Sequence, residues 1–302
     1  MDLADRTQDL YPMSYFEPPP PTRYTVLNLG AGVQSSCLAL MAARGEITPM
    51  PDFAVFADTQ AEPTSVYKWL EWLETQLPFP VIRVTKGNLT EDILRIRVKQ
   101  KSIYSDKPMT YLKMNIPVYG LTASRDRRNA IGRACTADYK VAPILKEIRK
   151  RCHIKHGQKE VTVTQWLGIS YDETQRMKLP GNRWTQHRWP LIEKRMTRAH
   201  CKEWMTRNGY PEPPRSACYY CPFHSDDEWR RLKTQDPEHF QKAVEFDRTY
   251  RRLQNENPGG LRIEVYLHGS CKPLDEVDFS NEEDKGQLGF DFQSECEGMC
   301  GL

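Results

Sequence analysis

Cysteines at close spacing are the strongest chemical signal in this chain of 302 residues. Cys218 and Cys221 belong to a Cys-Tyr-Tyr-Cys-Pro-Phe segment. Two thiolates at this spacing can bind one metal ion or one edge of an iron–sulfur cluster, and the following proline stiffens the turn. The same pair also suits a thioredoxin-like redox site or half of a zinc knuckle. A metal centre would therefore need further thiols from elsewhere in the chain.

Several other cysteines could supply those thiols. Cys135 lies in Arg-Ala-Cys-Thr, and Cys271 lies in His-Gly-Ser-Cys-Lys-Pro after a short apolar run. Cys296 and Cys300 stand close to the end of the chain, where a thiol pair could deliver or resolve a persulfide. The N-terminal residues lack the basic and apolar regions of a secretory signal, so nine cysteines indicate metal or redox chemistry rather than disulfides.

A glycine turn is the second chemical signal. Gly30-Ala31-Gly32 follows the apolar run 25–29 and precedes a helical pattern that begins near Ser35-Ser36. Glycines let the backbone approach an anion, and hydroxyls and N–H groups at a helix start can bind phosphate. The turn is not a Walker A motif, because no Gly-Lys-Ser/Thr follows, and it lacks the third glycine of the dinucleotide fingerprint.

Four segments in order resemble one superfamily. Residues 30–36 resemble the PP-loop, Ser-Gly-Gly-x-Asp-Ser, and residues 56–64 resemble its second-strand motif with the pair Asp58-Thr59. Residues 168–176 resemble the fourth-strand motif, and Trp-Pro-Leu at 189–191 resembles the reductases' Pro-Leu segment. Between about residues 24 and 229 the chain thus resembles the PP-loop ATP-pyrophosphatase and phosphoadenosine-phosphosulfate-reductase superfamily.

The resemblance implies an adenine-nucleotide site, with ATP as the nucleotide. The implied nucleotide residues are Gly30, Ala31, Gly32, Gln34, Ser35, Ser36, Asp58, Thr59, Gly168 and Arg176. Asp58, Lys140 and Arg176 are the implied catalytic residues. The loop departs from the family where its acidic residue would stand, at Gln34 or Ser35, so the resemblance implies phosphate binding more firmly than Mg²⁺ coordination.

The resemblance also implies a [4Fe-4S] cluster. Cluster-containing reductases carry a Cys-Cys pair, followed by Lys and Pro, and a distal Cys-x-x-Cys. Here Cys135 is followed by threonine, so Cys135, Cys218 and Cys221 leave one ligand position to fill. Either Cys271 fills it, or one iron stays open, as in three-cysteine enzymes that thiolate transfer RNA. A Zn²⁺ site from the same residues is the alternative metal centre, because thiolates suit both.

Strand and helix patterns must position these groups. We predict strands over residues 25–29, 52–57, 79–84 and 161–169, and helices over 35–44, 64–76, 141–150, 198–208 and 225–255. Their alternation predicts an α/β fold with a doubly wound, mainly parallel sheet. In domain terms we expect an irregular arm (1–23), the nucleotide-binding domain (24–195) with a basic insertion (83–155), a C-terminal cluster-binding region (196–279) and an acidic tail (280–302).

Charge is unevenly distributed along a chain whose formal net charge is only +3. Residues 83–155 contain 18 Lys/Arg and 6 Asp/Glu, a balance of +12, and tyrosines are interleaved among them. This pattern favours DNA or RNA as a partner, although a solvated helical surface would also show it. No apolar run is long enough to cross a membrane, and we expect a cytoplasmic protein that forms a homo-oligomer.

The reaction that these features favour is ATP-dependent sulfur insertion into a nucleic acid. A substrate oxygen would attack the α-phosphorus of ATP, and sulfur from a cysteine desulfurase or another donor would then displace AMP. The basic insertion and the broken Cys-Cys pair favour this branch. The tail cysteines and the Pro-Leu segment favour the alternative, a sulfonucleotide reductase. A third possibility is a non-catalytic nucleotide or nucleic-acid sensor, because the loop is altered.

Overall fold

The computed structural model describes residues 16–100, 107–257 and 263–280. Its centre is a parallel five-stranded sheet in the order β3-β2-β1-β8-β9. The strands are β1 (Tyr24–Asn28), β2 (Phe53–Asp58), β3 (Val81–Thr85), β8 (Val163–Leu167) and β9 (Thr185–Arg188). Four of them match the predicted strands to within a few residues, whereas β9 was not predicted.

The central strands are buried because helices cover both faces of the sheet. On one face α2 (Val33–Ala43), α3 (Thr64–Gln76) and α7 (Arg198–Arg207) enclose a core that includes Leu27, Leu70 and Trp166. On the other face α5 (Ala142–Arg151) contributes Ile144 and Ile148 to a second core. The predicted doubly wound α/β architecture is therefore confirmed at the level of a parallel sheet covered by helices.

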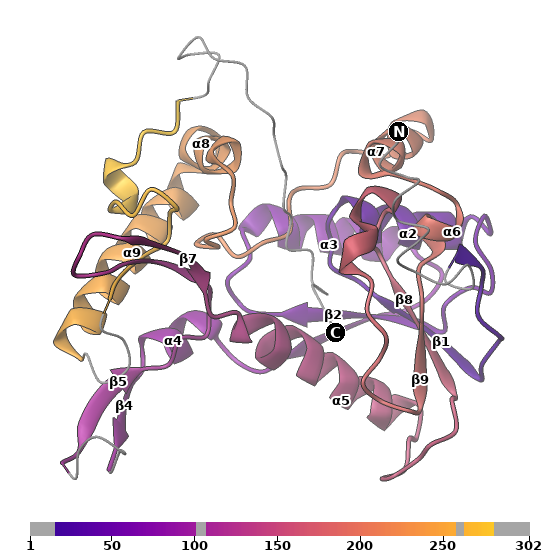
Figure 1. Cartoon of the computed structure of the whole chain (residues 1–302). Helices are drawn as coiled ribbons and strands as arrows, with labels where there is room; N and C mark the ends of the chain where they lie inside the picture. The colour runs from indigo at the N-terminus through magenta and orange to yellow at the C-terminus, as the bar shows by residue number, and fades with distance from the viewer. Residues whose placement is uncertain (1–15, 101–106, 258–262, 281–302) are drawn as a thin grey trace, which may run out of the picture.

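The other half of the molecule combines the first part of the basic insertion with the C-terminal region (Figure 1). A third core joins Leu89 and Ile116 to Tyr220, Trp229 and Phe246. The helices of this half are α4 (Leu89–Leu94), α8 (Asp226–Gln235) and α9 (Pro237–Glu256), with a 3₁₀ turn η4 (Leu274–Glu276). Its strands are β4 (Ile96–Lys99), β5 (Met109–Leu112), β6 (Val118–Leu121), β7 (Arg127–Ile131) and β10 (Glu264–Tyr266).

The predicted helix over 225–255 is wrong as a single element. α8 ends at Gln235 and α9 begins at Pro237. Proline disfavours helical geometry in the residue before it but suits the first position of a helix. Asp236 accordingly leaves helical geometry and caps α9, with its carboxylate accepting the His239 N–H at 3.4 Å.

Strand order identifies one position in the sheet as special. The chain runs outward from β1 through β2 to β3, then crosses back to β8 on the opposite side of β1. In open α/β sheets a ligand crevice lies at the carboxyl ends of the strands where the order reverses. Here that position lies at the carboxyl ends of the neighbouring strands β1 and β8. β1 leads into the Gly30 turn, and β8 leads into Gly168.

No described helix has the length and apolar character needed to cross a membrane.

Candidate functional site

The Gly30–Gly32 turn joins the end of β1 directly to α2. Ala31 adopts a left-handed backbone conformation, with φ of 60°, although its side chain is buried. Gly32 precedes the helix in extended geometry, and α2 starts with neither a side-chain cap nor an acidic residue in its first turn. The N–H groups of such a helix start favour an anion. The local geometry therefore suits phosphate binding by backbone groups.

The polar side chains that follow the turn are engaged inside the protein. Ser36 is fully buried, and its hydroxyl accepts a hydrogen bond from the Trp69 indole at 2.9 Å. The Ser35 hydroxyl accepts the Gly30 N–H at 3.2 Å. Gln34 is also fully buried. The assignment of Gln34, Ser35 and Ser36 to phosphate stays a prediction; of these three side chains, only Ser35 bonds within the turn itself.

The side-chain amide of Gln34 connects the turn with two arginines, directly with Arg198 and through Glu173 with Arg176. Its nitrogen donates to Glu173 at 3.1 Å, and its oxygen accepts from the Arg198 guanidinium at 2.9 Å. Glu173 in turn binds Arg176 at 2.6 Å, within the 3₁₀ element η3 (Tyr171–Arg176). Arg176 is thus connected to Gln34 through Glu173, and its nucleotide role stays a prediction. Arg198 was not among the predicted site residues, although it begins both a helix after the Thr197 cap and the segment after Trp-Pro-Leu that resembles the reductases.

Gly168 fixes the distance between the end of β8 and the first turn of α2. A Cβ atom added here would lie 2.9 Å from both Cα and N of Ser35. Real Cβ atoms do not approach backbone atoms so closely, so glycine is required for packing at this position. The residue lets the turn sit against the strand end, and its predicted nucleotide role stays a prediction.

We expect Gly168→Ala to destabilise the protein by about 2 kcal/mol, since the backbone must move to relieve the clash. Gly181→Ala is the matched control, because an added Cβ there meets no atom within 4 Å, and its effect should stay below about 0.5 kcal/mol. Urea unfolding followed by tryptophan fluorescence measures both variants. Equal midpoints for the two variants would contradict the packing role.

Asp58 and Thr59 lie at the end of β2, the neighbour of β1. One Asp58 oxygen accepts the Gln60 N–H at 2.7 Å and the Tyr67 hydroxyl at 2.8 Å. Burial, followed by this bond to Asp58, raises the pKa of Tyr67, which therefore stays a hydrogen-bond donor. The Thr59 hydroxyl is 3.3 Å from the sulfur of Cys218. Thr59 was predicted to bind the nucleotide. In the fold it connects the carboxyl end of β2 with Cys218.

Three of the predicted cluster cysteines lie around one cavity. Cys135, Cys218 and Cys221 line a space of about 30 Å³, together with Thr59 and Lys140. They come from segments more than 80 residues apart in the sequence. The predicted convergence of these thiols is therefore present in the fold.

Backbone contacts hold each cysteine at this cavity. The Cys135 N–H donates to the Asn115 carbonyl at 2.5 Å, and Cys135 precedes the π-helix η2 (Thr136–Val141). The Tyr219 N–H donates to Ala61 at 3.0 Å, which ties the Cys-x-x-Cys segment to the loop after β2. The fully buried His224 ring contacts the Cys218 carbonyl through Nε2 at 3.0 Å. Burial lowers the pKa of His224 well below its usual range, so the ring is neutral.

The charge of the cavity depends on a buried pair. Lys140 Nζ lies 3.7 Å from Glu62 Oε1, and both side chains are at least nine-tenths buried. Burial, followed by Glu62, raises the pKa of the Cys218 thiol well above its ordinary value, and Lys140 opposes that shift. The site therefore keeps Cys218 neutral unless a bound cation displaces its proton.

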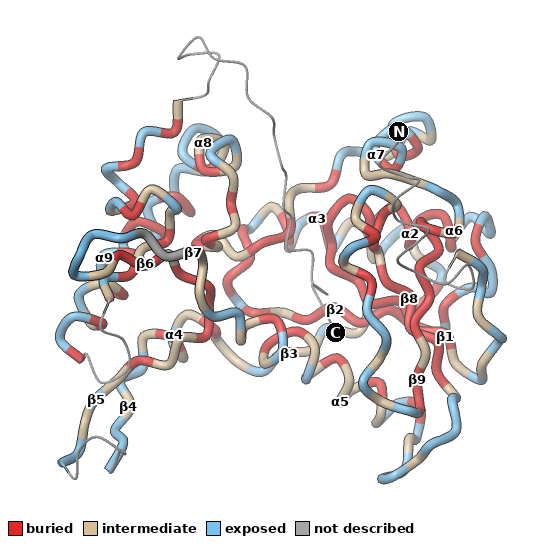
Figure 2. The backbone as a smooth tube through the Cα atoms, viewed as in Figure 1, coloured by how far each residue is buried: buried red, intermediate tan, exposed pale blue. Residues whose placement is uncertain are grey.

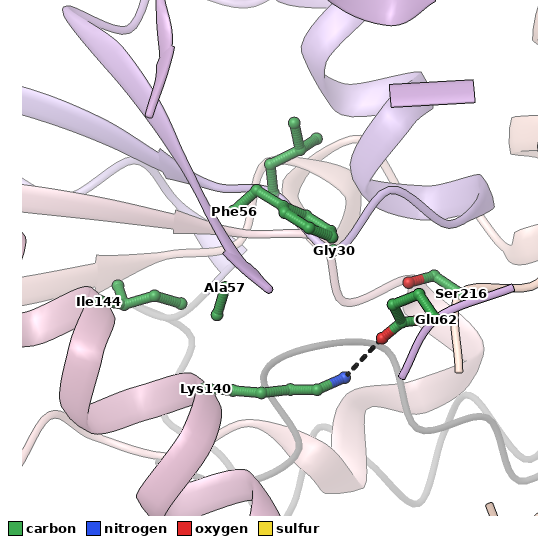
Figure 3. A pocket seen from close by; sticks show the side chains of 8 residues that line it. Gly30, Phe56, Ala57, Glu62, Lys140, Ile144 and Ser216 are labelled. Carbon is green, nitrogen blue, oxygen red and sulfur yellow. Dashed lines mark ion pairs between the residues drawn. The ribbon is translucent and has the colours of Figure 1, made fainter. Parts of the chain in front are cut away.

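Lys140 also lines a second, smaller cavity, at the carboxyl edge of the sheet (Figure 3). Gly30, Ala57 and Ser216 line that cavity with it, and the dashed line in Figure 3 marks its pair with Glu62. A single lysine thus connects the glycine turn with the cysteine cavity. Glu62 was not predicted as a site residue, although an acidic residue in a strand-to-helix turn was a usable signal.

Cys271 does not line the cysteine cavity. Its buried sulfur lies 3.6 Å from the Gly120 carbonyl oxygen, after strand β10, which pairs with β6. Burial is the largest cause of the raised pKa of Tyr119, and the nearby thiols of Cys221 and Cys271 raise it further. Tyr119 is therefore close enough to both thiols to interact with them electrostatically. The role of Cys271 as fourth ligand stays a prediction. Cys296 and Cys300 lie outside the described residues.

The thiols of Cys135, Cys218 and Cys221 were predicted to bind either a Zn²⁺ ion or a [4Fe-4S] cluster, and the two centres need different spacings between sulfur atoms. Tetrahedral zinc with Zn–S of about 2.3 Å brings its sulfur atoms within roughly 3.8 Å of each other. Among the described residues, no three His, Cys, Asp or Glu side chains are arranged to hold a metal ion. A cluster accepts thiols that are farther apart, because each binds a different iron. The [4Fe-4S] cluster and the Zn²⁺ site thus both stay predictions.

No protein-family model and no curated protein matches the chain.

Proposed function

We propose that the protein is an ATP-dependent sulfur-insertion enzyme that adenylates a nucleic acid and uses an iron–sulfur cluster. The observation that carries the proposal is the position of Lys140. This residue lines both the cavity beside the Gly30 turn and the cavity of Cys135, Cys218 and Cys221. A nucleotide site and a thiol-lined site in contact are what coupled adenylation and sulfur transfer require.

The phosphates of ATP would bind at the switch point of the sheet. The uncapped start of α2 would receive them through backbone N–H groups, with Arg176 and Arg198 held nearby by Glu173 and Gln34. Mg²⁺ would be bound largely by the phosphates themselves, because Asp58 already uses one carboxylate oxygen for internal hydrogen bonds. Positive charge at this edge would stabilise the pentavalent phosphorus and the departing pyrophosphate.

Adenylation forms one bond and breaks another. A substrate oxygen attacks the α-phosphorus, the bond to pyrophosphate breaks, and the substrate becomes an AMP ester. A sulfur nucleophile then takes the place of that oxygen, and AMP leaves. Lys140 is positioned to neutralise anionic groups on either side, since its amine lies between the two cavities.

Cys135, Cys218 and Cys221 are the residues that would hold the cluster, which when bound would supply iron able to bind the sulfur to be transferred. Because Cys271 lies outside the cavity lining, the arrangement favours three protein thiolates over four.

The proposal predicts two measurable properties of the purified protein. Prepared anaerobically, it should be brown and contain roughly four irons and four sulfides per chain. With ATP and a nucleic-acid substrate it should release pyrophosphate. Colourless protein with one zinc would contradict the cluster. Sulfite release from sulfated adenosine phosphate would indicate the reductase alternative, and tight nucleotide binding without any product would indicate a sensor.

A further inference from the structure

The β4–β5 ribbon is a two-stranded sheet that pairs with no other described strand. We use this name for residues 95–100 and 107–113, the described part of the hairpin. Figure 1 shows the ribbon extending away from the body of the second half, and Figure 2 shows that its residues are mostly exposed or half-buried. β5 packs against α9 and contributes Leu112 to the third core, which is the support that a two-stranded ribbon needs in water.

The charge of the β4–β5 ribbon has a single sign. It contains five basic residues and no acidic residue: Arg95, Arg97, Lys99, Lys107 and Lys113. The Arg95 side chain is 65% exposed, with Asp92 at the outer limit of an ion pair, 4.0 Å away. Lys99 is exposed at the last position of β4. Arg97 and Lys113 pair with Asp92 and Asp138 outside the ribbon, at 2.7 and 2.8 Å. Arg95 and Lys99 are therefore cations that it presents openly to solvent.

The ribbon also exposes apolar side chains. Ile96 is 47% exposed and Val98 is 57% exposed, which is unusual for large aliphatic residues on a strand. They share one face with Thr110 and Leu112, which stand opposite them in the register, and of these Leu112 is buried. Aliphatic side chains at a nucleic-acid interface contact sugars and thymine methyl groups.

A chain of hydrogen bonds connects the ribbon to the cysteine cavity. Arg97 donates to Asp92 at 2.7 Å, and the other oxygen of Asp92 accepts the Asn115 amide at 3.0 Å. The Asn115 carbonyl is the acceptor for the Cys135 N–H. Ile116 and Pro117, which follow β5, line the cavity itself. The base of the ribbon is therefore bonded to the segment that lines the proposed reaction site.

We propose that the β4–β5 ribbon binds the phosphodiester backbone of the nucleic-acid substrate and presents it to the cysteine cavity. The inference rests on the proposed function and assigns its substrate contact to one element. A second copy of the chain is a poorer occupant, because two ribbons with five cations each would repel one another. A two-stranded ribbon also has the width that the major groove of B-form DNA admits.

The test measures binding of a 20-base-pair DNA duplex and of a single-stranded RNA of matching sequence at several salt concentrations. The ribbon variant is Arg95→Ala/Lys99→Ala, which leaves Arg97 and its bond to Asp92 intact. With the duplex we expect roughly tenfold weaker binding, and a slope of log K against log salt that is smaller by about 1.8, or 0.9 per lost contact. With RNA the expected loss of slope is about 1.4.

Two further variants remove the same charge elsewhere. Lys68→Ala/Lys202→Ala alters exposed lysines on α3 and α7, which cover the sheet, and should leave affinity and slope unchanged. Lys146→Ala/Lys150→Ala alters α5, also within the basic insertion. A slope that falls with the α5 variant but not with the ribbon variant would overturn the ribbon assignment and leave the proposed function standing. Wild-type protein that binds neither probe at low salt would overturn both.

Discussion

Cys218→Ser should remove the bound iron and sulfide from the protein. The Cys218 residue is half-buried, its sulfur lies 3.3 Å from the Thr59 hydroxyl, and it lines the cavity shared with Cys135 and Cys221. Serine has nearly the same shape, but an alkoxide is a far poorer iron ligand than a thiolate. We expect less than one iron per chain, against roughly four in the unaltered protein after anaerobic purification. Iron and sulfide analysis and the visible spectrum measure the loss.

Cys201→Ser and Cys271→Ser are the matched comparisons. Cys201 is a buried cysteine of α7 in the core on the other side of the glycine turn, so its replacement should keep the iron. Cys271→Ser decides between the two ways of filling the fourth position. Because Cys271 does not line the cavity, we expect this variant to keep its iron. Loss of iron from Cys271→Ser would instead identify that thiol as the fourth ligand, and full retention in Cys218→Ser would exclude this cavity as the cluster site.

Elements with strong local patterns were predictable from the sequence. The helix 64–76 was predicted with its observed bounds, because Val66, Trp69, Leu70 and Leu73 recur at helical spacing and all four are buried. The strands β1, β2 and β8 are buried along nearly their whole length and rich in apolar residues, since both faces of a central parallel strand are covered. In each case the residues that determine the element lie within the element itself.

Elements stabilised by distant partners were not predictable in this way. β9 has the polar sequence Thr-Gln-His-Arg, yet three of its four residues are buried beside β8. Thr185 accepts from the Gln165 amide at 2.9 Å, and Arg188 binds Glu193 at 2.8 Å. Such a strand is stable only because its polar groups find partners that the local sequence does not reveal. The same applies to the β4–β5 ribbon, which the charge count described only as a basic stretch.

The candidate site also contains some contacts that the sequence predicted and others that it did not. The meeting of Cys135 with Cys218 and Cys221 was predicted by spacing and by family resemblance, both of which are written in the sequence. The bond between Gln34 and Arg198 and the pair of Lys140 with Glu62 were not, because each joins residues whose proximity depends on how the sheet and its connections pack. Buried polar pairs of this kind depend on tertiary geometry.

Lys140→Met should impair both stability and activity. Methionine keeps much of the length of the side chain but removes the cation 3.7 Å from the buried Glu62 carboxylate. Removing one partner of a buried ion pair typically costs about 3 to 5 kcal/mol, and both side chains here are at least nine-tenths buried. Urea unfolding should show a loss of about 3 kcal/mol. ATP-dependent pyrophosphate release should fall by about 100-fold or more, as when one transition-state donor is removed.

The double variant Lys140→Met/Glu62→Gln separates the two effects. Replacing the carboxylate with a neutral amide removes the uncompensated charge, so most of the lost stability should return. Pyrophosphate release should stay low, because the amine that faces the cavity beside the Gly30 turn is still missing. If the double variant regained activity together with stability, the contribution of Lys140 would be limited to neutralising Glu62. Stability restored without activity would place its positive charge in the reaction, between the two cavities that it lines.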